Sequence, residues 1–141
     1  MIETVLFACV HDAGRSQLAA AWFNYLADPA KARAISAGTQ PADFVHPEAV
    51  RVLAEDGVEV HLERPRLLTL AMVRQSSLVI TMGCGESCPV VPGQGREDWP
   101  VADPKGRPYP EFKEISAAIR ARAVDLLERR GWRGPGEVQR R

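Results

Sequence analysis

Apolar and polar residues recur along this chain with two different periods, and the shorter period marks predicted strands. Thr4–Ala8 and Ser77–Thr81 are short apolar runs with β-branched residues, a pattern typical of strands buried on both faces. Another strand is predicted over residues 32–36, followed by a turn at 37–39. Residues 58–60 are predicted to form a brief extended segment. Extended segments therefore recur at intervals long enough to hold a helix between them.

Helical spacing fills these intervals. A first helix is predicted to begin near Arg15 or Ser16, because the apolar residues that follow share one face: Leu18, Ala21, Trp22, Tyr25 and Leu26. A second helix covers residues 47–57, with proline in its first turn and glycine as its stop. A short helix is predicted over 67–74, and a long amphipathic helix over 111–130.

Strands separated by helices predict a single α/β domain with a parallel sheet and helices on both faces. Ligands of such sheets bind at the carboxyl ends of the strands. Cys9, Gly38 and Thr81 each close a predicted strand, so their loops should converge at one edge. The segment 83–109 has no periodicity and leaves the same edge, and a loop of this length is expected to be functional.

The length and charge of the chain limit its class. A chain of 141 residues suits one domain, which we expect to span residues 1–131, followed by a loosely ordered tail at 132–141. The 18 basic and 18 acidic residues cancel, which leaves no broad field to attract nucleic acid or an anionic membrane. We find no export signal and no apolar stretch of membrane-spanning length. We therefore expect a cytoplasmic protein that binds neither nucleic acid nor membranes.

The segment Cys9–Ser16 places a thiol and a guanidinium where a strand turns into a helix. Backbone N–H groups and the positive end of the helix dipole converge at such a junction. The dipole and Arg15 should favour the thiolate form of Cys9, which is the nucleophilic form. The segment therefore predicts a pocket that holds a tetrahedral oxyanion against a sulfur nucleophile. A buried, unreactive Cys9 is the alternative interpretation.

Oxyanion binding is assigned to the backbone of this loop and to the side chain that follows it: Val10, His11, Asp12, Ala13, Gly14 and Arg15. The planar fork of Arg15 can bind two oxygens of phosphate or arsenate, and Gly14 lets the backbone approach the ligand. Ser16 either caps the helix or donates its hydroxyl to the sulfur of Cys9. The side chain of His11 is interpreted as structural.

Two more thiols, Cys84 and Cys88, lie in the long loop among several glycines. They can form a disulfide if the turn brings their Cα atoms within about 7 Å. A relay then becomes possible, in which one loop thiol attacks Cys9 and the other resolves the product. Half of a zinc site and an inert buried pair are the alternatives, although zinc needs four ligands and the histidines are scattered.

Asp103 precedes a proline, which favours an extended conformation that projects the carboxyl group from its turn. A carboxyl group beside a bound oxyanion can act as a general acid. Residues 103–106 equally suit an ordinary turn, so the spacing alone leaves both interpretations open.

Five ordered blocks carry a resemblance to a known family: CVHDAGRS, SAGT, HPEAVRVLAEDGVEV, TMGCGESCPV and EDWPVADPKG, at 9–16, 36–39, 46–60, 81–90 and 97–106. Together they resemble the low-molecular-weight protein tyrosine phosphatases, and within that family the thioredoxin-coupled arsenate reductases. The resemblance implies a four-stranded parallel sheet flanked by helices and a Cys-x5-Arg-Ser loop that binds arsenate, with phosphate or sulfate as possible ligands of the same loop. It implies no metal and no organic cofactor.

The resemblance also implies roles for single residues. Cys9 matches the nucleophile, Arg15 and the loop amides match the oxyanion site, Ser16 tunes the thiolate, and Asp103 matches the general acid of the family. These residues alone imply only chemistry at a bound oxyanion.

Cys84 and Cys88 match the resolving thiols of the reductases. In this scheme Cys84 attacks the sulfur of Cys9 and arsenite departs. Cys88 then attacks Cys84, and a Cys84–Cys88 disulfide forms. The flexible loop is expected to carry the Cys84–Cys88 disulfide to the surface, where thioredoxin or a comparable thiol donor reduces it.

The sequence departs from the family at two points. Asp12 fills a loop position that is Asn in most relatives, and its negative charge would oppose both thiolate and oxyanion unless it is protonated or faces away. The spacing from Cys84 to Cys88 is also shorter than in the best-known bacterial members. Both departures concern how the thiols react.

Two other functions remain open. A phosphatase acting on phosphotyrosine or small phosphomonoesters would need only Cys9, Arg15 and Asp103, but such phosphatases usually carry tyrosines beside the Asp-Pro segment, where this chain has only Tyr109 nearby. A non-enzymatic oxyanion sensor would use the thiols as a trap, and no partner-binding or DNA-binding element is visible. The sequence therefore favours arsenate reduction.

Overall fold

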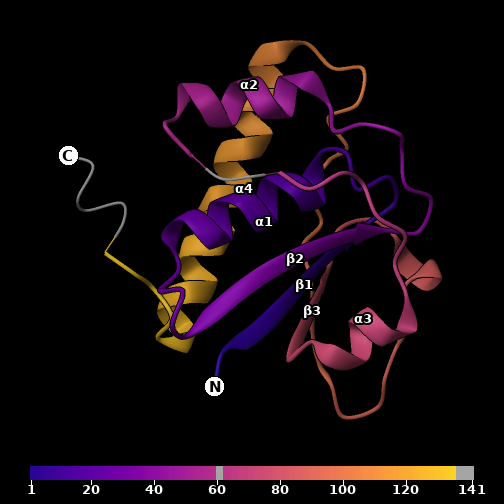
Figure 1. Ribbon diagram of the computed structural model, residues 1–141. Coiled ribbons are helices and arrows are strands. Elements are labelled where there is room, and N and C mark those ends of the chain that lie inside the picture. Colours follow the sequence, from indigo (N-terminus) through magenta and orange to yellow (C-terminus); the bar gives the residue numbers. More distant parts are fainter. Residues whose placement is uncertain (60–61, 136–141) are drawn as a thin grey trace.

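The computed structural model describes residues 1–59 and 62–135, which form a four-stranded parallel sheet with helices on both faces (Figure 1). The strands are β1 (Glu3–Cys9), β2 (Ala32–Gly38), β3 (Leu78–Thr81) and β4 (Gly95–Asp98), and they lie in the order β2-β1-β3-β4. All three strand pairs are parallel. The expected fold class is therefore confirmed.

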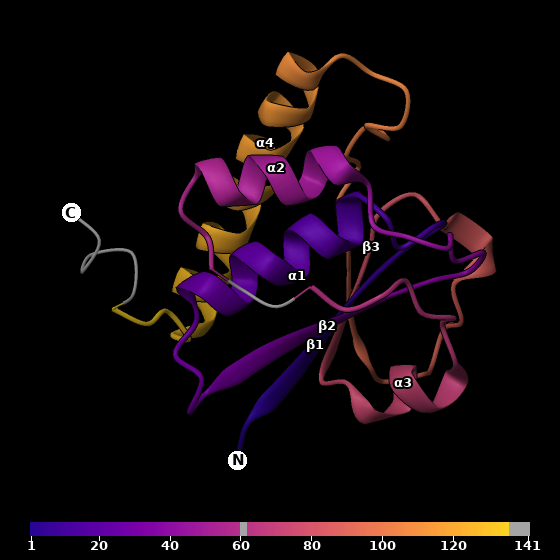
Figure 2. The same ribbon diagram turned by 45° about the horizontal axis from the view of Figure 1, so that its top comes forward.

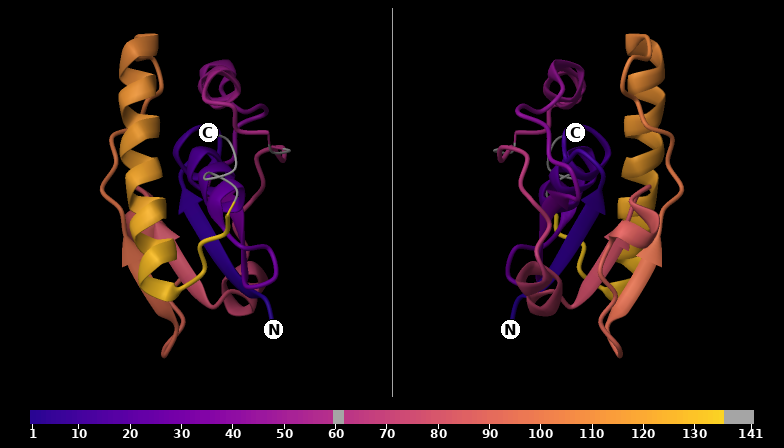
Figure 3. Two further views of the ribbon diagram at one scale, coloured as in Figure 1. Left: turned by 90° about the vertical axis from the view of Figure 1, so that its left-hand side faces the viewer. Right: turned by 90° about the vertical axis from the view of Figure 1, so that its right-hand side faces the viewer.

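The helices are α1 (Arg15–Leu26), α2 (Pro47–Glu55), α3 (Leu70–Gln75) and α4 (Tyr109–Arg130), with a 3-10 turn η1 at Gly85–Ser87. Helices α1 and α4 cover one face of the sheet, and α2 packs outside them, whereas α3 covers the other face (Figures 1 and 2). The side views in Figure 3 show α4 extending along the molecule beside β4. None of these helices is both long enough and apolar enough to cross a membrane.

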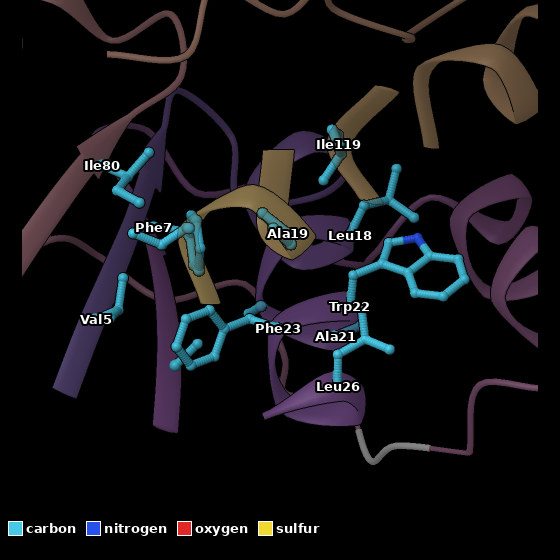
Figure 4. Close-up of a cluster of buried hydrophobic side chains, with 14 of the residues drawn as sticks. Val5, Phe7, Leu18, Ala19, Ala21, Trp22, Phe23, Leu26, Ile80 and Ile119 are labelled. Carbon is cyan, nitrogen blue, oxygen red and sulfur yellow. The ribbon is translucent and has the colours of Figure 1, made fainter. Parts of the chain in front are cut away.

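Alternation along β1 divides the core into two parts. Val5 and Phe7 point to the face that α1 and α4 cover, as Figure 4 shows, whereas Leu6 packs with Val73 of α3 on the opposite face. All of these side chains are fully buried. Burial of one such side chain contributes about 1.5–3 kcal/mol, so the strand that ends in Cys9 is held firmly from both sides.

The fourth strand comes from a different segment than the sequence pattern indicates. Residues 58 and 59 form no strand, because the N–H of Val58 instead closes the end of α2 on the carbonyl of Leu53, and residue 60 lies outside the described residues. Strand β4 arises from the predicted loop 83–109. Its sequence Gly-Arg-Glu-Asp is polar because the strand lies at the sheet edge and is mostly exposed.

Two other expectations need correction. The short helix starts at Leu70 instead of 67, because Thr69 caps it by accepting a hydrogen bond from the N–H of Met72. Residues 132–134 of the expected loose tail pack against the end of α1, where Trp132 is only 9% exposed and its carbonyl accepts the N–H of Asp28. Residues 136–141 of that tail lie outside the described residues.

Candidate active site

The ends of three strands meet at one edge of the sheet. Cys9 lies opposite Gly38 in the pairing of β1 with β2, and Ala8 lies opposite Thr81 in the pairing of β1 with β3. A Cβ atom at Gly38 would lie 2.6 Å from the carbonyl oxygen of Val10, so only glycine lets the loop after Cys9 pass directly over the end of β2. The expected convergence of these strand ends is therefore confirmed.

The backbone of the Cys9 loop is oriented by the segment that follows β2. The carbonyl groups of Cys9, Val10, His11 and Ala13 accept hydrogen bonds from the N–H groups of Thr39, Gln40, Ala42 and His46. In a trans peptide the carbonyl and the next N–H point in opposite directions. The N–H groups that follow these carbonyls therefore face away from the segment 39–46, and that of Asp12 donates to the sulfur of Cys9 over 3.3 Å.

Cys9 is a free, buried thiol that contacts the first turn of α1. Its Sγ lies 2.9 Å from the Oγ of Ser16. Ser16 does not cap the helix, because the N-cap position is Gly14 and no side chain caps it. Of the two roles that the sequence leaves open for Ser16, the structure therefore supports the contact with the sulfur.

Asp12 has left-handed backbone geometry, with φ +49°, and is fully buried. Its Oδ1 accepts the hydroxyl of Ser16 over 2.7 Å, and its Oδ2 accepts the backbone N–H of Arg66 over 3.0 Å. Burial raises the pKa of Asp12, while the hydrogen bonds from Ser16, Arg66 and Ser36 and the charge of Arg66 act against that rise. Both carboxyl oxygens are therefore held by hydrogen bonds, one from the first turn of α1 and one from the segment before α3.

Arg15 and Asp103 lie together. The guanidinium of Arg15 donates from Nη1 to the carbonyl of Val101 over 3.3 Å, and its Nη2 lies 3.7 Å from Oδ2 of Asp103. Arg15 is buried, whereas the side chain of Asp103 is 45% exposed. Gly83 lies against the guanidinium, since a Cβ atom there would overlap Nη1 of Arg15. The segment with Asp103 and the loop with Cys9 are therefore joined through one arginine.

Cys84 and Cys88 form a disulfide, as the sequence analysis allows, with a Cα–Cα distance of 5.8 Å. The disulfide does not lie at the surface: Cys84 is 8% and Cys88 is 3% exposed, and both pack with Ala8 and Leu68. The expectation of a surface disulfide is therefore wrong for this state. The reason is that η1 folds over the end of β1 and places Sγ of Cys84 3.7 Å from the carbonyl oxygen of Ala8.

Several residues that form this site were not found from the sequence. The N–H of Arg66 and the carbonyl of Val101 act through their backbone, which carries no signal in residue identity. His46 packs over Gly14, where an added Cβ would lie 3.1 Å from Cδ2 of its ring, and burial lowers the pKa of His46. The positive φ of Gly83 is the one case in which the residue type gives a usable signal.

The side chain of His11 contacts the backbone of the segment that follows β2. Its Nδ1 lies 3.0 Å from the carbonyl oxygen of Gln40. It therefore helps to fix the segment after β2 against the loop.

Cys9 at the end of β1, the buried Arg15 six positions later and the N–H of Asp12 directed at the sulfur define the candidate site. Residues 4–131 match the family described as low molecular weight phosphotyrosine protein phosphatase. The chain belongs to this family.

Proteins that are similar to this chain include arsenate reductases. The arsenate reductase of Brevibacillus brevis is 31% identical over 89% of this chain and 95% of its own length. The structure of a thioredoxin-dependent arsenate reductase from Corynebacterium glutamicum is 38% identical with a TM-score of 0.79; the match covers 90% of this chain, which spans 61% of that longer chain. An arsenate reductase structure from Archaeoglobus fulgidus is 32% identical with a TM-score of 0.73, and covers 88% of this chain and 98% of its own.

Proposed function

We propose that this protein reduces arsenate to arsenite with electrons from thioredoxin or a comparable thiol donor. The observation that carries the proposal is the position of all three cysteines at one strand end. Cys9 closes β1, Cys84 lies against the carbonyl of Ala8 in the same strand, and Cys88 is bonded to Cys84. Hydrolysis of a phosphate ester needs only the first thiol. A two-electron reduction also needs a second thiol, which forms a disulfide with the first. The similarity to proteins named arsenate reductases supports the same activity.

In the first proposed step, the thiolate of Cys9 attacks the arsenic atom of arsenate. Arg15 and the amides of residues 10–15 hold the arsenate oxygens, because the pocket supplies donors that match a tetrahedral anion. An oxygen of arsenate leaves as water after protonation, and Asp103 supplies that proton from its partly exposed position beside Arg15. The product is a Cys9–arsenic bond with arsenic still in its oxidised state.

In the second step, the thiolate of Cys84 attacks the sulfur of Cys9. The electron pair of the sulfur–arsenic bond goes to arsenic, which leaves as arsenite, and a Cys9–Cys84 disulfide forms. Cys88 then attacks Cys84 and releases Cys9 as a thiolate. The Cys84–Cys88 disulfide in the structure corresponds to the end of this sequence.

Regeneration requires access to a buried disulfide. The segment around η1 must move away from Ala8 and Leu68 before a dithiol partner can reach either sulfur. Gly83 and Gly85, both with positive φ, flank Cys84 and provide backbone freedom for this movement. We propose that the reaction takes place in the cytoplasm, where thiol donors are kept reduced.

The test compares arsenite formation and hydrolysis of para-nitrophenyl phosphate in three proteins: the unmodified chain, Cys88→Ser and Cys9→Ser. With arsenate and a thioredoxin system, the unmodified chain should turn over many times. Cys88→Ser should release about one arsenite per protein and stop as the Cys9–Cys84 disulfide, because nothing resolves it. Cys9→Ser should form no arsenite.

Equal multiple turnover by Cys88→Ser and the unmodified chain would contradict the three-thiol relay. Phosphatase turnover without arsenite formation would show that the protein is a phosphatase, for which Cys9, Arg15 and Asp103 are sufficient. Binding of arsenate without either product would point to an oxyanion sensor.

A further inference from the structure

A continuous chain of hydrogen-bonded side chains leads from Cys9 into the protein. Sγ of Cys9 lies 2.9 Å from Oγ of Ser16, which in turn lies 2.7 Å from Oδ1 of Asp12. Cys9 is 2% exposed, and Ser16 and Asp12 are fully buried. A proton that leaves Cys9 along these contacts therefore reaches Asp12.

Ser16 has a single hydroxyl hydrogen, so it can donate to only one of its two neighbours at a time. If it donates to the carboxylate of Asp12, then Cys9 must be the donor and remain a thiol. If it donates to a thiolate at Cys9, then Asp12 must hold a proton and donate to Ser16. Both arrangements satisfy every contact, and they differ only in the position of one proton.

The surroundings of Asp12 keep its carboxyl group hydrogen-bonded to Ser16. Oδ2 accepts the backbone N–H of Arg66, so rotation of the group would break a buried hydrogen bond. The groups that face Asp12 are Cys9 at the end of β1, Ser16 of α1, Ser36 of β2 and the charge of Arg66 in the segment before α3. Only Arg66 among them carries a fixed positive charge, and burial opposes a permanent negative charge on Asp12.

We propose that Asp12 accepts the proton of Cys9 through Ser16, so that one proton is shared between the thiol and the carboxyl group. This inference rests on the proposed role of Cys9 as nucleophile. When the thiolate forms, the S–H bond of Cys9 breaks and its proton passes to Oγ of Ser16. The original hydroxyl hydrogen of Ser16 passes to Oδ1 of Asp12. Thiol and carboxylate become thiolate and carboxylic acid, and the net charge does not change.

With a shared proton, Asp12 does not add a second negative charge beside the thiolate in the anion-binding loop. An arriving oxyanion meets a thiolate backed by a neutral acid, instead of a thiolate beside a carboxylate. A second ionisation is disfavoured, because Ser16 cannot donate to both anions and their charges repel. Asp12 acts through Ser16 and does not touch the substrate itself.

The test measures the rate of Cys9 alkylation by neutral iodoacetamide against pH, in a Cys84→Ser/Cys88→Ser protein where Cys9 is the single thiol. Proton exchange within the pair takes up no proton from solvent, so the rate should change by less than about twofold over a pH unit at intermediate pH, where an isolated thiol gains about tenfold. A second rise at higher pH should follow when the last proton leaves. The intermediate form should also show the infrared C=O band of a carboxylic acid.

Asp12→Asn is the matched control, because the amide can still accept the N–H of Arg66 and donate to Ser16, as the protonated acid would. Its alkylation profile should have a single step, at lower pH than the second step of the Asp12 protein, and the acid band should be lost. Ser16→Ala interrupts the chain and should also give a single step.

A single step in the Asp12 protein would overturn the shared proton, and this result does not depend on the folding of Asp12→Asn or Ser16→Ala. Two steps that persist in Asp12→Asn would overturn the assignment to Asp12. The measurement uses neither arsenate nor thioredoxin. Failure of the proton chain is therefore distinguishable from failure of the proposed arsenate reduction.

Discussion

Replacement of Gly83 by alanine tests whether the pocket depends on the position of Arg15. Gly83 has φ +97°, and a Cβ atom there would overlap Nη1 of Arg15. The guanidinium is buried and fixed by the carbonyl of Val101 and by Asp103, so it has little room to move aside without losing these contacts. Gly85 is the matched control, because it flanks the same cysteine with φ +56° and a Cβ atom there meets nothing within 4 Å.

The two substitutions share a backbone cost and differ in the contact with Arg15. Positive φ costs an alanine about 1–3 kcal/mol, so both variants should lose stability of this order. Displacement of the guanidinium from the anion should remove a further ~1.5–3 kcal/mol of binding energy, the value of hydrogen bonds to charged groups. At about 1.4 kcal/mol per tenfold, phosphate should bind roughly 10- to 150-fold more weakly to Gly83→Ala and with unchanged affinity to Gly85→Ala.

Calorimetric titration with phosphate measures this affinity without turnover, and urea unfolding measures the shared backbone cost. Equal phosphate affinity in Gly83→Ala and Gly85→Ala would refute the reasoning. It would mean that the anion does not depend on the guanidinium position, or that Arg15 relaxes freely despite its burial.

Three further predictions concern stability. Ser116→Ala removes the hydroxyl group that accepts the buried indole N–H of Trp22 over 3.0 Å. This change should lower the free energy of unfolding by about 1–3 kcal/mol in urea unfolding. Trp132→Ala should lower the free energy of unfolding by about 3–5 kcal/mol in the same assay, because the ring is buried and packs edge-on against Phe23. A change near zero would show that the tail is loosely packed. Burial lowers the pKa of His46, so the neutral ring is favoured in the folded protein. Stability should therefore fall as pH drops below about 6.5, and urea midpoints of His46→Gln should fall less.

The order of elements could be predicted from the sequence because each main element has a strong local pattern. The strand ending in Cys9 is apolar on both faces, and the spacing of apolar residues indicates α1 and α4. Strand β4 could not be predicted, because at the sheet edge its residues are polar, and backbone pairing with β3 forms the strand without an apolar signal. Trp132 likewise shows its burial only through contacts with the distant helix α1.

The sequence determines which chemical groups are available at the candidate site: the thiols Cys9, Cys84 and Cys88, the guanidinium of Arg15 and the carboxyl group of Asp103. Their chemistry depends on residue type and short spacing, which a linear sequence contains. The sequence also shows that Asp12 places a negative charge in the predicted anion-binding loop. It does not show in which direction the carboxyl group points.

Only the tertiary structure decides how these groups affect one another. The route from Cys9 through Ser16 to Asp12 depends on left-handed geometry at Asp12 and on a backbone N–H at Arg66, which is 54 residues away. The burial of Cys84 and Cys88 depends on packing against Ala8 and Leu68. Proton position and thiol access are set by distances and solvent exclusion between remote segments, and no local pattern in the chain encodes either quantity.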